Sequence, residues 1–226
     1  MKPEAIIVFG AGLGTRMGTL TRERPKPLIE VAGKPLISHA LALARGAEIG
    51  RVVVNVHAHA AMMRDWLALE APDVITSHEA DILETGGGLK RALPLLGDGP
   101  ALTLNSDMVW GGPNPLKRLV STWDSTRMDG LLCLVPRADA LGHKGHGDFD
   151  LSFDGRISRR GAAFVYAGAG IIKPRALDRF EGKFSLNPVW DAMLAKGRLH
   201  GVVHEGPWVD VGRPEGIAIA EAALAE

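Results

Sequence analysis

The sequence predicts an α/β domain with a mostly parallel, mixed sheet flanked by helices. Short apolar runs alternate with amphipathic stretches along the 226 residues, which is the pattern of strands that alternate with helices. The run Val52-Val53-Val54 is continuously apolar, as expected for a strand buried on both faces of a parallel sheet. A glycine-rich loop follows the first apolar run directly, as in a Rossmann-like sheet that opens onto a ligand.

The first part of the chain divides into regular strand and helix units. Apolar runs predict five strands, at residues 5–9, 51–56, 73–77, 101–105 and 130–136. Amphipathic stretches between them predict four helices, at residues 36–47, 58–70, 88–95 and 115–124. Units of this kind favour parallel pairing, because the helix returns the chain to the edge where the previous strand began.

The pattern changes from about Leu141. The glycine- and histidine-rich segment 142–149 is expected to be a loop. Beyond it we expect strands at 148–153, 163–172 and 200–204, a helix at 187–196, an apolar and aromatic run at 208–212, and a helix at 213–225. We therefore expect a single domain over residues 1–226, with one half up to about residue 140 and a second half over about 141–226.

The composition excludes several classes of protein. Hydrophobic residues make up 46% and charged residues 23% of the chain, and 26 basic residues balance 26 acidic ones. A nucleic-acid partner usually requires a basic excess, so we expect none. No apolar run approaches the roughly 18 residues of a membrane span, and no leader precedes the first strand, so we expect no membrane association. The single cysteine, Cys133, lies in an apolar run and is expected to be a buried thiol, which suits a cytoplasmic protein.

The strongest functional pattern is the loop after the first strand. Gly10, Gly12 and Gly14 follow the apolar run 6–9, and Arg16 and Lys26 come soon after. Glycine lacks Cβ, so its backbone N–H group can approach an anion closely. The two cations add positive charge where phosphates would gather. The loop therefore predicts a site for a nucleoside triphosphate or a similarly charged ligand.

Two common phosphate-binding loops do not fit this spacing. The dinucleotide fingerprint G-x-G-x-x-G matches at Gly10 and Gly12, but its third glycine falls on Thr15, and the segment 30–35 reads as a turn without the expected acidic strand end. The G-x-x-x-x-G-K-[ST] loop fails because no glycine here precedes Lys-Ser or Lys-Thr. A dehydrogenase is therefore disfavoured.

The remaining pattern, G-x-G-T-R-M followed by P-K-P-L, resembles the signature of the sugar-1-phosphate nucleotidyltransferases. The family usually has two alanines before the first glycine, where this chain has Gly10-Ala11. The resemblance implies a nucleotidyltransferase or GT-A-like form of the Rossmann-like sheet, with a nucleotide-binding first half and a sugar-phosphate-binding second half. It also implies that the triphosphate is held by Ala11, Gly12, Leu13, Gly14 and Thr15, with Arg16 and Lys26 serving the reacting phosphates.

Two aspartates are candidates for a magnesium site. Asp107 follows the apolar strand that ends at Asn105, and ligands of open α/β sheets bind beyond the carboxyl ends of strands. Asp210 follows another apolar and aromatic run, in a D-x-G context. In the family, a strand-end aspartate and a late D-x-G aspartate carry the metal. Mg²⁺ takes one or two carboxylates and completes its shell with phosphate oxygens and water.

A second glycine cluster spans residues 79–88. Three consecutive glycines at a helix start cost about 1 kcal/mol each relative to alanine, so we expect something to approach this backbone closely. In the family the corresponding L-G-T-[AG] segment lines the nucleobase, and here Glu84 takes a glycine position. A carboxylate there can accept from the imide of uracil or from guanine amines, and the sequence leaves this open. The nucleotide-binding set implied by the resemblance is completed by Glu79, Glu84, Thr85, Gly86, Gly87 and Asn105.

The Leu-Glu-Thr-Gly-Gly-Gly run and the Gly-His-Gly-Asp-Phe run at 145–149 narrow the resemblance. They resemble the N-acetylmuramic acid 1-phosphate uridylyltransferases of cell-wall recycling, which lack a C-terminal β-helix. This implies UTP and N-acetylmuramic acid 1-phosphate as substrates. It further implies that His143 and His146 can meet the sugar phosphate or the lactyl carboxylate, and that the acceptor is bound by Asn105, His146, Asp148 and Gly168.

The implied reaction is an in-line nucleotidyl transfer to a sugar 1-phosphate. The acceptor phosphate is already a nucleophile, so positioning and charge neutralisation by Arg16, Lys26 and Asp107 are expected to carry catalysis. Alternatives are a hexose-1-phosphate guanylyltransferase such as one for mannose 1-phosphate, a phosphocholine cytidylyltransferase, and a non-catalytic nucleotide sensor. A sensor has no need of both metal carboxylates and both cations. The oligomeric state is left open.

Overall fold

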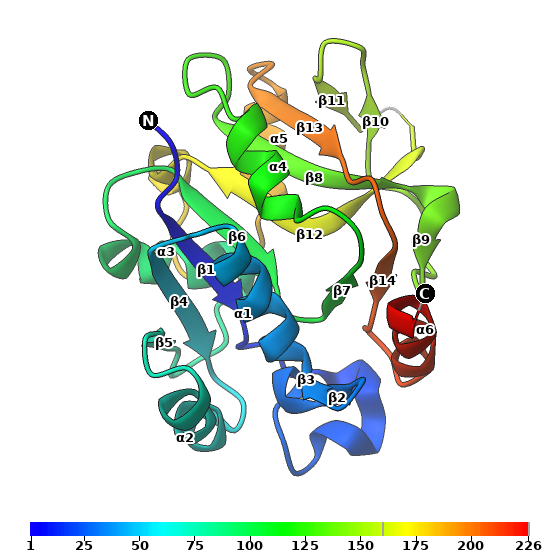
Figure 1. Cartoon of the computed structure of the whole chain (residues 1–226). Helices are drawn as coiled ribbons and strands as arrows, with labels where there is room; N and C mark the ends of the chain where they lie inside the picture. Colours follow the sequence, from blue (N-terminus) through cyan, green and yellow to red (C-terminus); the bar gives the residue numbers. More distant parts are fainter. Residues whose placement is uncertain (160, 226) are drawn as a thin grey trace.

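A seven-stranded mixed sheet runs through the middle of the molecule (Figure 1). The structure is a computed structural model and describes residues 1–159 and 161–225. The strands lie in the order β13, β8, β12, β6, β1, β4 and β5. β12 runs antiparallel to its neighbours β6 and β8, whereas the other adjacent pairs are parallel. This arrangement confirms the predicted α/β fold.

Most strand positions agree with the sequence prediction. The seven strands are β1 (Ala5–Phe9), β4 (Arg51–Val56), β5 (Ile75–His78), β6 (Ala101–Asn105), β8 (Gly130–Pro136), β12 (Phe164–Ile172) and β13 (Leu199–Val203). β1, β4, β6 and β8 begin and end where the apolar runs predict. β5 is displaced toward the C-terminus, whereas β13 begins and ends one residue before the predicted range.

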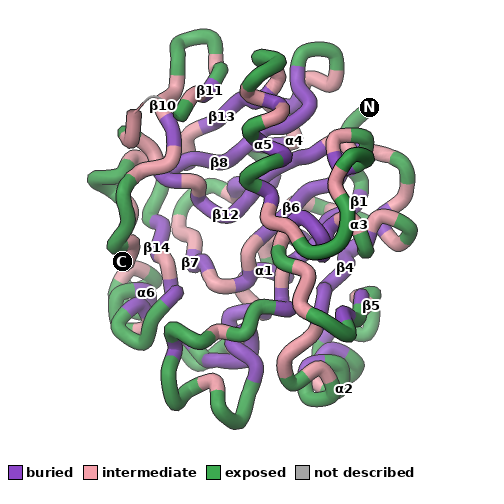
Figure 2. The backbone as a smooth tube through the Cα atoms, turned by 180° about the vertical axis from the view of Figure 1, so that it is seen from behind, coloured by how far each residue is buried: buried purple, intermediate pink, exposed green. Residues whose placement is uncertain are grey.

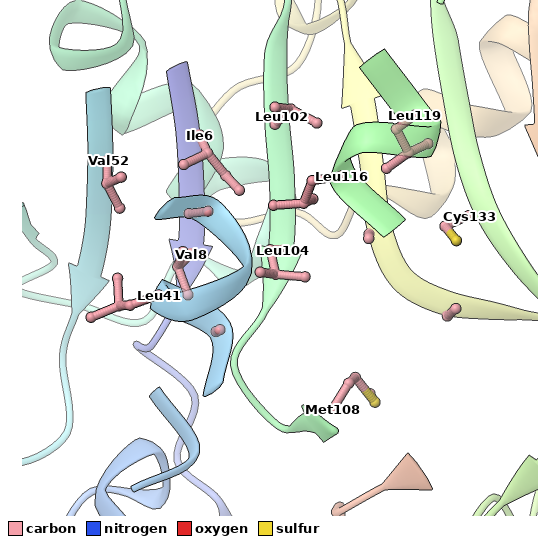
Figure 3. Close-up of a cluster of buried hydrophobic side chains, with 14 of the residues drawn as sticks. Ile6, Val8, Leu41, Val52, Leu102, Leu104, Met108, Leu116, Leu119 and Cys133 are labelled. Atoms are coloured by element: carbon pink, nitrogen blue, oxygen red, sulfur yellow. The ribbon is translucent and has the colours of Figure 1, made fainter. Parts of the chain in front are cut away.

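Helices cover both faces of this sheet. They are α1 (Leu36–Gly46), α2 (Ala60–Glu70), α3 (Glu84–Leu96), α4 (Pro115–Thr122) and α5 (Asn187–Leu194), whereas α6 (Glu215–Ala225) packs on a smaller sheet. α1, α2 and α4 share one buried cluster with Ile6 and Val8 of β1, as the side chains of α1 and α4 in Figure 3 illustrate. α3 and α5 share another cluster with Ile7, whose side chain points to the opposite face.

The burial pattern explains why the central strands read as continuous apolar runs. In β4, Val52 is 6% exposed, and Val53 and Val54 are fully buried. Because helices lie on both faces, neither alternate set of side chains meets water. Figure 2 shows the same pattern, with buried segments along the strands and exposed segments over the helices and loops.

Short elements surround the main sheet. Three small strands, β7 (Met108–Trp110), β14 (Trp208–Asp210) and β9 (Ala140–Leu141), form a second sheet in the order β7, β14, β9. α6 packs on it through Ala220. The segment 30–35, predicted as a turn, is a hairpin of β2 (Glu30–Val31) and β3 (Lys34–Pro35). The remaining elements are the hairpin strands β10 (Asp150–Leu151) and β11 (Ile157–Ser158), and the 3₁₀ helices Thr15–Thr21, Lys26–Leu28, Arg137–Asp139 and Pro174–Leu177.

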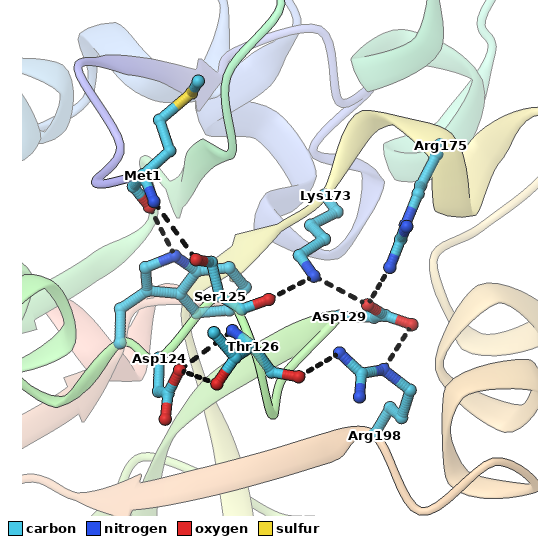
Figure 4. A network of polar contacts seen from close by, with 9 residues as sticks. Met1, Asp124, Ser125, Thr126, Asp129, Lys173, Arg175 and Arg198 are labelled. Carbon is cyan, nitrogen blue, oxygen red and sulfur yellow. Dashed lines mark hydrogen bonds and ion pairs between the residues drawn. The ribbon is translucent and has the colours of Figure 1, made fainter.

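A charged cluster joins three strands at the end of the sheet away from the carboxyl ends of its parallel strands (Figure 4). Asp129, which precedes β8, forms ion pairs with Lys173, Arg175 and Arg198 at distances of 3.0, 2.9 and 2.9 Å. Burial alone would raise the pKa of Asp129, but the hydrogen bonds from Arg198, Arg175 and Lys173 outweigh it and hold that pKa well below its usual value. The cluster therefore anchors the starts of β8 and β13 to the end of β12.

Two further expectations concern the single cysteine and membrane-spanning helices. Cys133 is fully buried in β8, and burial raises the pKa of its thiol to about 12, so it is an inert core residue. Within residues 1–159 and 161–225, no helix is long and apolar enough to cross a membrane.

Candidate active site

A cavity of about 180 Å³ opens at the carboxyl ends of β1, β4 and β6. The glycine loop forms one side of it, the segment from Glu79 to Thr85 forms another, and Asn105 to Asp107 form its floor. The residues predicted from the sequence that line it are Ala11, Gly12, Lys26, Glu79, Glu84, Thr85, Asn105 and Asp107. Its position is the one predicted for a ligand of an open α/β sheet.

The conformation of the glycine loop depends on Gly14 and leaves Gly12 uncovered. Gly14 adopts a left-handed conformation, with φ of 63°, and its Cα lies so close to Lys26 that an added Cβ would be 2.9 Å from the Lys26 Cβ. At Gly12 an added Cβ would meet no heavy atom within 4 Å, so this residue faces open space. Thr15 begins a 3₁₀ helix directly after the loop. This arrangement leaves the loop open on its cavity side, where phosphate oxygens can approach the backbone.

Lys26 and Asp107 form a short ion pair beside the cavity. The Lys26 Nζ lies 2.6 Å from the Asp107 Oδ2, and the side chains are 10% and 22% exposed. The 3₁₀ helix Lys26–Leu28 positions the lysine, and the end of β6 positions the aspartate. The pair brings together two of the three residues predicted to be catalytic.

Asp210 lies on the small sheet next to Asp107. The backbone N–H of Val211 donates to the carbonyl of Asp107 at 3.0 Å, which brings the ends of β14 and β6 together. The third predicted catalytic residue, Arg16, also lies here, as the surroundings of Gly212 indicate. A Cβ added to Gly212 would be 2.7 Å from the Asp210 Oδ1 and 3.4 Å from both terminal nitrogens of Arg16, so the two side chains approach the same point. The predicted cations and carboxylates therefore share one location.

The electrostatics of the two aspartates suit a divalent cation. Burial raises the pKa of Asp210 above its usual value, and the nearby Asp107 carboxylate raises it further. The Asp210 Oδ1 is buried and has no hydrogen-bond partner among the described residues. In that part of the chain no group of three or more His, Cys, Asp or Glu side chains is placed to hold a metal by itself. Two carboxylates with an unpaired oxygen fit Mg²⁺, which takes its other ligands from phosphate and water.

A buried polar network supports the cavity from behind. The Glu79 carboxylate, 1% exposed, accepts from Asn55 Nδ2 at 2.7 Å and from the backbone N–H of Leu83 at 3.0 Å. Asn55 Oδ1 in turn accepts from the N–H of Gly10 at 2.8 Å. Glu79 therefore ties the 79–83 segment to the start of the glycine loop. Asn55 was not predicted as a site residue, although it is a polar residue that interrupts the apolar run Val52–Val56 near the end of β4.

The structure gives a different reason for the three consecutive glycines. The N–H groups of Gly86 and Gly87 donate to the carbonyl of Phe184 at 2.9 and 3.0 Å. An added Cβ at Gly86 would overlap the Phe184 ring, and one at Gly88 would lie 2.6 Å from the Glu79 Oε1. The expectation that something approaches this backbone closely is therefore met by the chain's own segment around Phe184, and the role of Gly86 and Gly87 in nucleotide binding stays a prediction.

Glu84 differs from its glycine neighbours because it faces the cavity. It is exposed, lines the cavity, and has φ of 61°, which is a left-handed conformation. Residues with a Cβ rarely adopt this conformation, whereas glycine does so readily. This explains why a glycine was expected here from the resemblance. The next residue, Thr85, uses its Oγ1 to accept from the N–H of Leu186 at 3.1 Å.

The predicted acceptor residues fall into two groups. Gly168 (φ of 88°) lies at an irregularity of β12, where an added Cβ would be 3.1 Å from the Asn105 Cβ, so Gly168 and Asn105 are adjacent near the cavity. Asp148 and His146 lie outside the residues that line it. One Asp148 oxygen accepts from the N–H of Tyr166 at 2.8 Å, and the carbonyl of His146 contacts the ring of His143.

Comparison with known proteins shows the family of this chain. Residues 6–146 match the family of MobA-like NTP transferase domains. The chain is 42% identical to the N-acetylmuramate alpha-1-phosphate uridylyltransferase of Caulobacter vibrioides, over 99% of this chain and 98% of that protein. It is 31% identical to the protein of the same name from Neisseria meningitidis, over 91% and 92% of the two chains.

More distant proteins share the fold. The mannose-1-phosphate guanyltransferase of Hypocrea jecorina is 30% identical, over 92% of this chain and 61% of that protein. The crystal structure of HddC from Yersinia pseudotuberculosis complexed with GMP-PN superposes with a TM-score of 0.79 at 22% identity, covering 99% of this chain and 100% of that one. At that identity the similarity establishes the fold.

Proposed function

The chain belongs to the family of MobA-like NTP transferases, and we propose that it transfers the uridylyl group of UTP to N-acetylmuramic acid 1-phosphate. The products are a UDP-sugar and pyrophosphate, in the cytoplasmic recycling of cell-wall sugars. The similarity to the Caulobacter vibrioides uridylyltransferase extends over nearly the whole of both chains, which supports the choice of substrates. The observation that carries the chemistry is the Lys26–Asp107 pair beside the glycine loop.

The residues of the site match the steps of this reaction. An acceptor phosphate oxygen forms a bond to the α-phosphorus of UTP, and the bond from that phosphorus to the bridging oxygen of pyrophosphate breaks. The attacking oxygen is already deprotonated, so no side chain has to remove a proton. Lys26 lies where it can neutralise charge at the α-phosphate, and Arg16 stabilises the leaving pyrophosphate. Gly12 and Gly14 allow the triphosphate to lie against the loop backbone.

Asp107 and Asp210 are the residues that would hold Mg²⁺. The unpaired Oδ1 of Asp210 and the mutual repulsion of the two carboxylates support this assignment. When bound, the cation would neutralise phosphate charge during transfer. When Asp107 binds the cation, its ion pair with Lys26 is weakened. A phosphate of the bound nucleotide can then take the place of Asp107 as the partner of Lys26.

The base and the acceptor are proposed to bind on opposite sides of these phosphates. Glu84 and Thr85 line the cavity on the base side. Asn105 and Gly168 are adjacent on the acceptor side, and Asp148 and His146 follow on the neighbouring loop. In this arrangement Glu79 lines the base side of the cavity and also supports it through its hydrogen bonds with Asn55 and Leu83.

A hexose-1-phosphate guanylyltransferase is the second candidate. Relatives named mannose-1-phosphate guanyltransferase are about as similar to this chain as the Neisseria protein, although the chain spans about three fifths of their length. A carboxylate at Glu84 can accept from two guanine donors, N1–H and the 2-amino group, but from only one imide of uracil. Base selection therefore needs a direct measurement.

The test is pyrophosphate release with Mg²⁺ across five triphosphates, UTP, GTP, CTP, ATP and dTTP. Each is paired with the 1-phosphates of N-acetylmuramic acid, N-acetylglucosamine, glucose and mannose. We expect a strong preference for UTP with N-acetylmuramic acid 1-phosphate, and no activity in Asp107→Asn. Preference for GTP with mannose 1-phosphate would establish the second candidate, and silence in every pair would refute both.

A further inference from the structure

The loop 142–147 is held against the proposed metal site. Gly142 follows β9 with φ of 73°, and an added Cβ there would lie 2.5 Å from the carbonyl oxygen of Asp210. At the other end of the loop, an added Cβ at Gly147 would overlap the backbone of Ala162. The loop is therefore packed between the end of β14 and the segment before β12, and its first side chain, His143, lies beside Asp210.

The contacts of the His143 ring determine which nitrogen carries the proton. His143 Nε2 lies 3.0 Å from the carbonyl oxygen of His146. A carbonyl oxygen can only accept, so Nε2 must carry hydrogen and donate it. The neutral ring therefore has its lone pair at Nδ1. Gly145 packs on the ring, because an added Cβ there would lie 2.7 Å from Nε2, and this contact restricts any rotation.

The Nδ1 lone pair faces a carboxylate. Nδ1 lies 3.9 Å from the Asp210 Oδ2, and the two side chains are 20% and 15% exposed. Two acceptors at this separation repel each other unless a donor lies between them, and 3.9 Å is too long for a direct hydrogen bond. The other charged groups that act on Asp210 are Asp107, Lys26 and Arg16, and Lys26 is engaged by Asp107.

We propose that His143 is a positioning residue for the metal site. Through Nδ1 it accepts a hydrogen bond from a water in the hydration shell of the cation held at Asp210. Mg²⁺ keeps several waters when it binds to proteins, and coordinated water is a strong donor. The inference rests on the proposed function, which places the cation at Asp210.

Two consequences follow for the acceptor loop. With Nε2 donating to His146 and Nδ1 accepting from water, the neutral His143 ring has no free donor for an acceptor phosphate or carboxylate. The side chain of His146 makes no hydrogen bond to another described residue and stays available for the acceptor. His143 therefore couples the order of the acceptor loop to the presence of the cation.

The test measures Mn²⁺ affinity by electron paramagnetic resonance, on the full chain with a non-hydrolysable UTP analogue. Asparagine places an acceptor oxygen close to the position of Nδ1, and glutamine places a donor nitrogen close to that of Nε2. We expect His143→Ala and His143→Gln to weaken Mn²⁺ binding by about 10- to 100-fold, the range typical of lost outer contacts to a metal site. We expect His143→Asn to stay within about 3-fold of the unmodified chain.

Control variants separate the possible failures. His39 also donates from Nε2 to a backbone carbonyl, that of Val31 at 3.0 Å, but it lies on α1 away from the cavity, so His39→Gln should leave Mn²⁺ affinity unchanged. If His143→Gln binds normally while His143→Asn does not, His143 acts only by holding the loop and the proposal is wrong. Normal binding by His143→Ala also overturns it. If Asp210→Asn binds Mn²⁺ normally, the metal site itself is misplaced and the proposed function fails at that point.

Discussion

Substitutions of Glu84 test separately its effect on the stability of the fold and its effect on recognition of the nucleotide base. Its φ of 61° is a left-handed conformation at the start of α3, and its side chain lines the cavity. A left-handed conformation costs about 1–2 kcal/mol for a residue with a Cβ. Glycine avoids this strain but loses about 0.5–1 kcal/mol more backbone entropy than alanine on folding. Glu84→Gly should therefore be more stable than Glu84→Ala by about 0.5–1 kcal/mol.

This order reverses the usual one, since alanine is normally the better helix residue. For a chain of this length the difference corresponds to about 1–4 °C in Tm, which differential scanning calorimetry resolves. Both variants lack the carboxylate, so they should lose recognition equally. If Glu84 accepts a hydrogen bond from the base, kcat/KM for UTP should fall by about 10- to 100-fold in both variants.

The two measurements can fail independently. If Glu84→Ala melts at or above the temperature of Glu84→Gly, the strain argument at residue 84 is refuted. If both variants use UTP as well as the unmodified chain, the carboxylate does not read the base. Glu84→Gln provides a matched control, because it keeps the size and the strain but removes the charge.

Three further predictions follow from the geometry. Arg16→Ala and Lys26→Ala should each lower kcat by at least about 10²-fold, because each variant lacks a cation that we propose contacts the reacting phosphates. The circular dichroism spectrum should be unchanged. Near-normal turnover of either variant would show that its residue has no part in the mechanism. Gly86→Ala should lower the free energy of unfolding in urea by about 1–3 kcal/mol, because the added Cβ overlaps the Phe184 ring. Gly12→Ala should not lower it, because Gly12 faces open space. Equal stability of the two variants would contradict the packing around Gly86. Asp129→Asn should destabilise the chain by at least about 2 kcal/mol at pH 7, because three cations lose their carboxylate. The folded pKa of Asp129 is depressed, so its contribution is present above about pH 4 and is lost as the pH falls toward the folded value. The difference between the two proteins should therefore narrow in acid, and a constant difference would show that the charge is not responsible.

The main sheet was predictable because its strands carry their own signal. β1, β4, β6 and β8 are apolar runs with clear ends, and burial on both faces makes that signal strong. The small sheet of β7, β14 and β9 was not predicted, because its strands are only two or three residues long. Its pairing joins segments that are far apart in the sequence, and no local pattern reports such a pairing.

The same distinction applies to the site. Gly12, Lys26 and Asp107 belong to a recognisable pattern, and the structure places all three at one cavity. Asn55 belongs to no motif, and its role arises from the register that pairs it with Phe9 of β1. The glycines at 86 and 87 were recognised as unusual, but the atoms that crowd them come from a segment about 100 residues later, so the sequence could not identify the cause.

The location of the site at the junction of two sheets has an electrostatic consequence. Asp107 follows β6 of the main sheet by two residues, and Asp210 ends β14 of the small sheet, so the hydrogen bond from Val211 to Asp107 brings the two carboxylates together. Lys26 compensates Asp107 directly, but Asp210 has a raised pKa and a buried oxygen that no group in the described part of the chain hydrogen-bonds. Folding therefore leaves a deficit of positive charge at Asp210, beside the glycine loop that we propose binds the phosphates. Asp107 and Asp210 would hold a divalent cation there, and that cation would supply the missing charge, which is the physical reason for proposing nucleotidyl transfer at this junction.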